Sequence, residues 1–129
     1  TDAFIEVKAK NLEEAFSVAG KSVVETIIDL KNIQEVEKKS IKVKGRNLQN
    51  LLYNWLEEIV TITITDGFAI SNFSVNIKKN AEYEIVSTVS GEKLDLEKHN
   101  FKVEIKSPTF HLMEIKENDE VTMRYLLDL

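Results

Sequence analysis

The sequence predicts an α+β fold, in which a β-α-β-α half is followed by a meander of antiparallel strands. Two segments carry apolar residues at helical spacing, and each begins directly after an asparagine that can cap it. The neighbouring segments alternate apolar and polar residues as half-buried strands do, and after Asp66-Gly67 only such segments follow. Strands joined without helices pair mostly antiparallel, and two helices can cover only one face of a sheet. We therefore expect both helices to pack on one side of the sheet.

The first half of the chain begins with a strand and a helix. Residues 3–9 alternate, with the small and aliphatic side chains on one face. Asn11 and Glu14 have the spacing of a capping box, in which the two side chains satisfy backbone N–H groups at the start of a helix. Apolar residues then recur at helical spacing and predict a helix over 12–29, followed by a strand over 36–43.

A second helix is predicted after Asn47, which is its cap. The apolar positions that form its stripe are Leu48, Leu51, Leu52, Trp55, Leu56 and Ile59. Residues 59–65 are rich in β-branched side chains and favour a strand by propensity alone. Because this stretch continues a strong amphipathic pattern, we place the end of the helix near Ile62, before the Asp66-Gly67 turn.

The second half of the chain is predicted to contain strands only. The alternating segments are residues 68–77, 83–90, 101–106, 110–115 and 121–127. Asp95 to His99 has the pattern of a single capped helical turn between two of them. Pro108 has no backbone N–H, so its strand is expected at a sheet edge or at a bulge.

Composition limits the class of protein. The chain has 129 residues, which predicts a single domain over 1–129, and it has no cysteine for thiol chemistry, iron–sulfur clusters or zinc fingers. Its net charge of −5 argues against direct nucleic-acid binding, so a link to RNA would need a protein partner or a small local patch. There is no apolar run of bilayer length, so we expect a cytoplasmic protein that does not contact the membrane.

No catalytic residues are predicted. The nucleotide-binding and hydrolase motifs that are recognisable from sequence are missing, so we do not expect an enzyme. His99 is expected to close the 91–99 loop through a hydrogen bond, and His111 to be a partly buried strand residue. A metal-dependent hydrolase using Asp2, Asp128 and His111 is an alternative, but no nucleophile–base pair can be named for it.

The acidic residues at the two ends suggest a different chemistry. Asp2 opens the first strand, and Asp128 closes the last strand beside the carboxylate of Leu129. If these strands are neighbours, three oxygen-bearing groups converge, and such hard ligands suit calcium or magnesium. The alternative is that both aspartates are solvated. Lys106 follows Glu104 by two residues on the same strand face, where an exposed ion pair is the simplest interpretation.

Seven segments together resemble the archease family, and they occur in the family's order along the chain. They read DAFI at 2–5, LEEAF at 12–16, LLYNWLEE at 51–58, DG at 66–67, GEKLDLEKH at 91–99, EIKSPTFH at 104–111 and DL at 128–129. The chain departs from the family pattern at Phe4 and Ala9, where glycine is common, and at Ser107-Pro108, where a small and an aliphatic residue are usual. These departures leave the aspartates in place, and the resemblance implies the archease fold.

The resemblance also implies an accessory role. Archeases assist the RtcB-type RNA ligase of tRNA splicing, which uses GTP and manganese and attaches GMP to its own histidine. By this resemblance the chain would promote guanylylation of the ligase and its multiple turnover. The resemblance further implies that Asp2, Asp128 and the backbone of Leu129 bind a divalent cation, calcium first among them. Lys106 and His111 would then lie near the acidic tip, which is the end of the molecule that carries Asp2 and Asp128, and would help to activate the partner.

Two other functions stay open at this point. A chaperone-like module could keep an RNA-modifying enzyme, such as a tRNA methyltransferase, soluble and correctly oriented. A structural interaction domain, in which the terminal aspartates have no role, is the other alternative. Calcium-dependent stabilisation would distinguish a protein with a metal site from a structural interaction domain, because a ligand that binds only the folded state raises the stability of that state.

Overall fold

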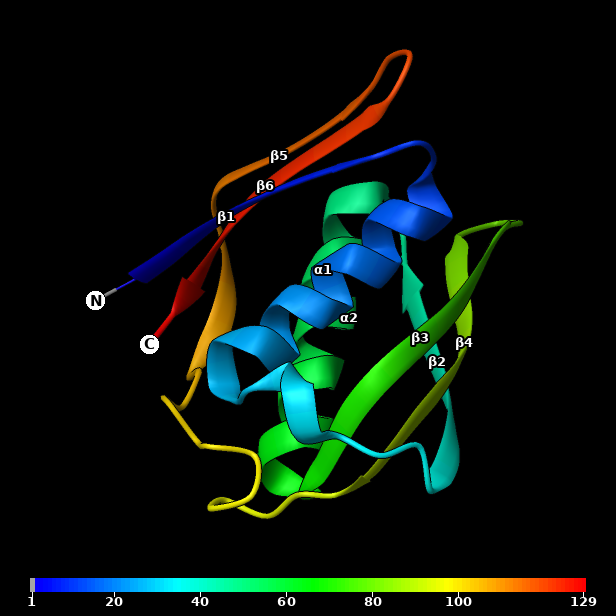
Figure 1. Cartoon of the computed structure of the whole chain (residues 1–129). Helices are drawn as coiled ribbons and strands as arrows, with labels where there is room; N and C mark the ends of the chain where they lie inside the picture. Colours follow the sequence, from blue (N-terminus) through cyan, green and yellow to red (C-terminus); the bar gives the residue numbers. More distant parts are fainter. Residues whose placement is uncertain (1) are drawn as a thin grey trace.

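The computed structural model describes residues 2–129 and confirms the α+β class. The elements are β1 (Asp2–Ala9), α1 (Leu12–Ile27), η1 (Leu30–Asn32), β2 (Glu37–Gly45), α2 (Leu48–Val60), η2 (Thr61–Thr65), β3 (Phe68–Lys79), β4 (Tyr83–Lys93), β5 (Ser107–Glu117) and β6 (Val121–Asp128). Figure 1 shows the two long helices lying between two groups of strands. The predicted order of β-α-β-α followed by antiparallel strands is therefore confirmed.

The strands form two sheets rather than the single sheet that the sequence suggested. One sheet has the order β1-β6-β5 and the other has the order β2-β4-β3, and all neighbours are antiparallel. Because β4 already has a partner on each edge, β5 cannot continue the meander beside it. Helix α1 contacts β1 and β3, and α2 contacts β2 and β5, so each sheet has the helices on one face.

Both helices begin where the sequence predicts. The side chain of Asn11 accepts a hydrogen bond of 2.9 Å from the backbone N–H of Glu14, and Asn47 accepts one of 2.8 Å from Asn50. The β-branched segment after α2 is helical rather than a strand, as predicted, but it continues past the predicted end near Ile62 as the π-helical turn η2, which ends at Thr65. Among residues 2–129, no helix combines the length and apolar character that crossing a membrane requires.

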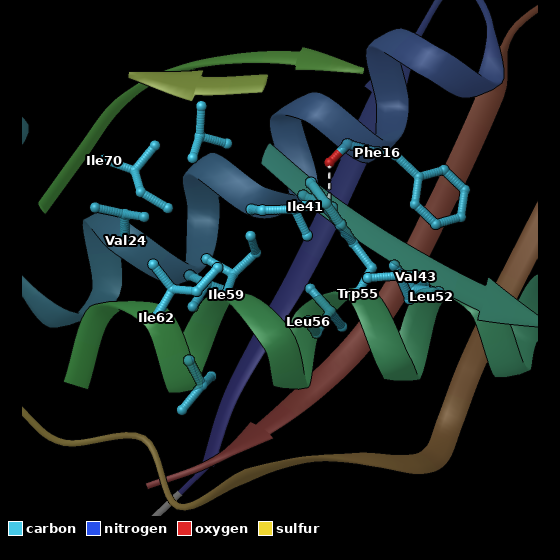
Figure 2. Close-up of a cluster of buried hydrophobic side chains, with 14 of the residues drawn as sticks. Phe16, Val24, Ile41, Val43, Leu52, Trp55, Leu56, Ile59, Ile62 and Ile70 are labelled. Carbon is cyan, nitrogen blue, oxygen red and sulfur yellow. Dashed lines mark hydrogen bonds between the residues drawn. The ribbon is translucent and has the colours of Figure 1, made fainter. Parts of the chain in front are cut away.

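The core lies between the helix pair and the inner faces of the two sheets. Figure 2 shows a part of it, in which Trp55 of α2 lies against α1 and donates a hydrogen bond of 2.8 Å from Nε1 to the carbonyl oxygen of Phe16. The indole also meets Phe73 of β3 edge-to-face, with ring centroids 6.0 Å apart. Trp55 therefore connects both helices to the second sheet.

The predicted strand over 101–106 is wrong. This segment belongs to neither sheet and connects the two sheets instead. In this segment the backbone N–H of Phe101 donates to the Leu96 carbonyl, that of Lys102 to the Ile27 carbonyl at the end of α1, and that of Lys106 to the Asp128 carbonyl. The apolar alternation arises because Ile105 is buried against the core while its neighbours are exposed. An alternation of apolar and polar residues indicates that one side of an extended segment is buried. A connecting segment can show this pattern without pairing with another strand.

Candidate functional site

The two chain ends meet in one antiparallel pair. Strand β1 pairs with β6 so that Asp2 lies directly opposite Asp128, and Ser107 of β5 lies on the other side of Asp128. Figure 1 shows the start of β1 beside the end of β6. Directly opposite residues on one face of an antiparallel pair have Cβ atoms about 5 Å apart. The tertiary structure thus brings together the two carboxylates that the sequence analysis selected.

A surface cleft of about 410 Å³ opens at this end of the sheet. Its lining consists of Asp2, Ser107, Thr109, His111, Leu126 and Asp128. The sequence analysis did not select the two hydroxyl residues or Leu126. Pro108 was the one sequence feature that could have directed attention to Ser107 and Thr109, because it predicted an irregular strand at this point.

A bulge in β5 shapes one wall of the cleft. Thr109 pairs with Leu126, whereas the next pair of opposite residues is Glu114 with Arg124, so three extra residues of β5 are accommodated there. Within the bulge, Leu112 has a φ of 60°, in the left-handed region. The predicted edge or bulge at Pro108 is confirmed, because β5 is an edge strand and the irregularity begins just after the proline.

The bulge changes the environment of His111. The sequence analysis expected a partly buried side chain, but His111 is exposed and this prediction is wrong. The cause is the extra chain length, which removes the regular alternation of inward and outward side chains. The backbone N–H of His111 donates a 3.1 Å hydrogen bond to Oγ1 of Thr109, which ties the start of the bulge together.

An aromatic stack holds the bulge against α2. The ring of Phe110 lies parallel to that of Tyr53, with centroids 4.4 Å apart and an interplanar angle of 8°. Phe110 is still half exposed, and Phe4 and Leu112 are exposed on the same end of the molecule. Exposed apolar side chains thus lie next to residues that line the cleft, since Phe4 is opposite Leu126 and both Phe110 and Leu112 adjoin His111.

The other two predicted residues adjoin the cleft but do not line it. The backbone N–H of Lys106 donates a 2.7 Å hydrogen bond to the carbonyl oxygen of Asp128, and the lysine side chain is exposed. The side chain of Leu129 packs against the hydrophobic core. The structure thus gathers Asp2, Asp128 and His111 in one cleft, with Lys106 and Leu129 joined to it through the backbone.

The donor atoms at the cleft are those that a hard cation prefers. Two carboxylates and the hydroxyl groups of Ser107 and Thr109 supply oxygen, which suits calcium or magnesium. Within residues 2–129, neither aspartate has a basic side chain within 4.0 Å. The same residues contain no cluster of three or more His, Cys, Asp or Glu side chains that could hold a metal. A cation here would therefore need hydroxyl, backbone or water oxygens in addition to the two carboxylates.

Farther along the same sheet, Glu6 of β1 and Arg124 of β6 form an ion pair. Arg124 Nε lies 2.6 Å from Oε2 of Glu6, and this hydrogen bond lowers the pKa of Glu6 and raises that of Arg124. Glu114 is a second partner of Arg124, at 3.6 Å. Arg124 therefore pairs with Glu6 and Glu114 and leaves the two aspartates at the cleft without this partner.

A second polar cluster closes the 91–99 loop, as predicted for His99. The imidazole is fully buried, its Nδ1 accepts a 3.0 Å hydrogen bond from the backbone N–H of Asp95, and its Nε2 lies 2.8 Å from Oε2 of Glu92. The backbone N–H of Gln34 and the ammonium of Lys98 also donate to Glu92. Each of these polar groups has a hydrogen-bond partner within the cluster, so the cluster stabilises the loop.

Comparison with known proteins identifies the family. The model of the Archease protein family (MTH1598/TM1083) matches residues 1–129. The chain belongs to the archease family. The archease of Pyrococcus abyssi is 36% identical over 107 residues, which are 82% of this chain and 75% of that protein. The archease of Pyrobaculum islandicum is 34% identical over 131 residues, covering 99% of this chain and 89% of the relative.

Solved structures of archease relatives share the fold. The solution structure of Methanobacterium thermoautotrophicum protein 1598 has a TM-score of 0.80 and 30% identity, and covers 99% of this chain and 92% of that one. The crystal structure of a Thermotoga maritima archease, described as a possible chaperone, has a TM-score of 0.65 and 18% identity, with coverage of 98% and 90%. At 18% identity, the similarity to the Thermotoga maritima protein shows the shared fold alone.

Proposed function

We propose that the chain is an accessory protein of an RtcB-type RNA ligase and promotes the GTP-dependent guanylylation and multiple turnover of that ligase in tRNA splicing. Membership of the archease family supports this proposal. The observation that carries it is the pairing of Asp2 with Asp128 at a cleft, with no basic side chain beside either within residues 2–129.

The cleft would act as an acidic tip. Asp2 and Asp128 would hold a divalent cation, calcium in the first instance, with help from Ser107, Thr109 and the backbone of Leu129. When bound, such a cation orients oxygen ligands and neutralises negative charge, as metals do around phosphates. An acidic tip is also complementary to the basic, metal-containing cleft of a phosphoryl-transfer enzyme, and complementary charge speeds encounter.

The residues around the tip would position it in the partner. Lys106 offers an exposed cation that is connected through its backbone to Asp128, at a point where phosphate groups could be contacted. His111 is presented to solvent by the bulge, whose other side is held by the stack of Phe110 on Tyr53. His111 on the wall of the cleft and Lys106 beside the cleft would thus be two side chains that can contact the ligase.

The test is the guanylylation rate of the RtcB-type ligase from the same organism. Ligase, labelled GTP and manganese are incubated with and without a sub-stoichiometric amount of this chain, and covalent label is followed over time. We expect faster labelling and repeated ligation turnover. Asp2→Asn and Asp128→Asn should lose this effect, whereas Asp119→Asn, in the hairpin at the far end of the same sheet, should keep it.

Two results would contradict the proposal. The first is a ligase that is active alone and is not accelerated by the wild-type chain. The second is full activation by both aspartate variants, which would separate the accessory role from the acidic tip. Circular dichroism of each variant establishes that the fold is retained, and Lys106→Ala then tests the adjoining cation.

A chaperone-like role toward a tRNA-modifying enzyme, such as a methyltransferase, is the second candidate. The observation that favours it is the set of apolar side chains beside the cleft, where Phe4, Phe110 and Leu112 are 55%, 52% and 60% exposed. This role predicts that the chain suppresses aggregation of the enzyme. Phe4→Ser with Leu112→Ser should weaken that suppression, while the aspartate variants should leave it unchanged.

A further inference from the structure

The outer face of the β2-β4-β3 sheet carries a concentration of positive charge. Lys38, Lys42 and Lys44 alternate along β2 with their side chains pointing away from the helices, and Lys78 lies on the same face of β3. The one acidic side chain on this face is Glu84, which lies on β4 between Lys44 and Lys78. We call this surface the lysine face.

The charge of the lysine face has the opposite sign to that of the whole protein. Four lysines and one glutamate give the face a net charge of +3, in a chain whose net charge is −5. The rest of the molecule therefore carries −8. Because charges farther apart than about 10 Å are largely screened at 0.1 M salt, an approaching ligand senses the local face rather than the total.

The four lysines are available to a ligand. All of them are exposed, and within residues 2–129 none forms an ion pair. Asn72, Ser74 and Asn76 of β3 lie on the same face and are also exposed, and the half-buried Val86 of β4 lies between Lys42 and Asn76. The face therefore presents four lysines together with hydrogen-bonding side chains, and Glu84 offsets only part of its positive charge.

The spacing and chemistry of the lysine face fit a chain of phosphates. Lys42 and Lys44 are two residues apart on one strand, a separation of about 7 Å, and β2 and β3 are separated by about 10 Å across β4. The face has no aromatic side chain on which a base could stack. Contacts of this kind go to the sugar–phosphate backbone and do not read the base sequence.

We propose that the lysine face binds the phosphate backbone of RNA. The choice of RNA rests on the proposed function, since the ligase that the chain would assist acts on RNA ends. The acidic tip lies on the other sheet, at the junction of β1 and β6, so the two surfaces can be occupied at the same time. One molecule would thereby contact both the ligase and the RNA.

The test measures binding of a labelled 20-nucleotide single-stranded RNA to the isolated chain by fluorescence anisotropy, at several salt concentrations. For single strands, log K falls with log salt by about 0.7 for each phosphate contact, so four contacts predict a slope of about −2.8. Lys42→Gln with Lys44→Gln should halve this slope and raise the Kd about 25-fold at 0.1 M salt. The matched control, Lys8→Gln with Lys21→Gln, changes the total charge equally on other surfaces and should leave the slope unchanged.

Three results would overturn the proposal. They are no binding of RNA at 50 mM salt, equal losses in the test and control variants, and tighter lysine-dependent binding of polyglutamate than of RNA, which would assign the face to an acidic protein. Glu84→Gln provides a gain-of-function check, because it removes the one negative charge and should lower the Kd. The ligase is not present in this assay, so its outcome is separate from that of the guanylylation test.

Discussion

Glu92 and His99 are joined by a hydrogen bond of 2.8 Å, and the imidazole is fully buried. Because Nδ1 accepts the N–H of Asp95, the ring hydrogen lies on Nε2 and is donated to the carboxylate. The backbone N–H of His99 bonds to the Asp95 carbonyl, and its own carbonyl accepts from Asp29 after α1. Glu92 and His99 together thus connect β4, the 95–99 turn and the residues that follow α1.

The Glu92 cluster should make the protein sensitive to acid. Hydrogen bonds from the N–H of Gln34, then from Lys98 and His99, lower the pKa of Glu92 from 4.5 to about 2. A lowered pKa means that this group contributes stability fully above pH 4.5 and loses it as the pH falls toward 2. Glu92→Gln should therefore reduce stability at pH 7, and the difference from wild type should shrink by pH 3.

Urea unfolding at pH 7 and at pH 3 measures this difference. Glu97→Gln is the matched control, since Glu97 lies on the same turn with an exposed side chain and should change little at either pH. A Glu92→Gln variant that is as stable as wild type at pH 7 would show that the cluster does not stabilise the fold.

Gly91 should not tolerate a side chain. A Cβ atom at this position would collide with the carbonyl oxygen of Ala69, where β3 and β4 come close beside the bulge between Ile70 and Asn72. Because that oxygen belongs to the backbone, the strands must shift, and Gly91→Ala should cost about 3 kcal/mol. Gly67→Ala is the comparison, with a φ of 66° but open space around it, and should cost about 1–2 kcal/mol. Equal losses in thermal unfolding would contradict the steric argument.

Calcium should stabilise the folded chain through the two aspartates. At a calcium concentration 100 times the Kd, the free energy of unfolding should rise by about 2.7 kcal/mol. Asp128→Asn should remove most of this gain, and Asp119→Asn should retain it. Differential scanning calorimetry with calcium, magnesium or chelator makes the comparison, and equal calcium stabilisation of both variants would place the cation elsewhere.

The aromatic stack should control the order of the β5 bulge. Phe110→Ala removes the contact with Tyr53, so we expect a loss of about 0.5–1.5 kcal/mol and faster hydrogen exchange in residues 109–113. Phe101→Ala is a suitable control, because Phe101 is also partly exposed and is not stacked on another ring within residues 2–129. Unchanged exchange in the bulge would show that α2 does not hold it.

Features that depend on near neighbours in the chain were predictable from the sequence. The caps at Asn11 and Asn47 come from contacts within a few residues, and the amphipathic stripes follow from the local spacing of apolar residues. The missing N–H of Pro108 is likewise a property of one residue. The hydrogen bond of His99 also follows this rule, since Glu92 and Asp95 are close in sequence. The α+β class follows because the order of helices and strands is itself a local property.

The candidate site was predictable in part. Asp2 and Asp128 were selected from their positions at the two ends, and the pairing of β1 with β6 brings them together. Ser107, Thr109 and the exposure of His111 were not predictable, because they depend on three extra residues in β5 and on the stack against Tyr53. No pattern along the chain indicates how a strand with extra length will be accommodated.

The elements, their order and the chemical character of the two ends follow from the amino-acid sequence alone, since capping, periodicity and charge are properties of neighbouring residues. The division of the strands into two sheets arises from long-range pairing, because β4 has partners on both edges and leaves β5 to pair with β6. The same arrangement separates the charges, with the aspartates on one sheet and Lys38, Lys42, Lys44 and Lys78 on the other. A net charge is a sum over the chain, whereas a partner meets one face, and the fold determines which charges share that face.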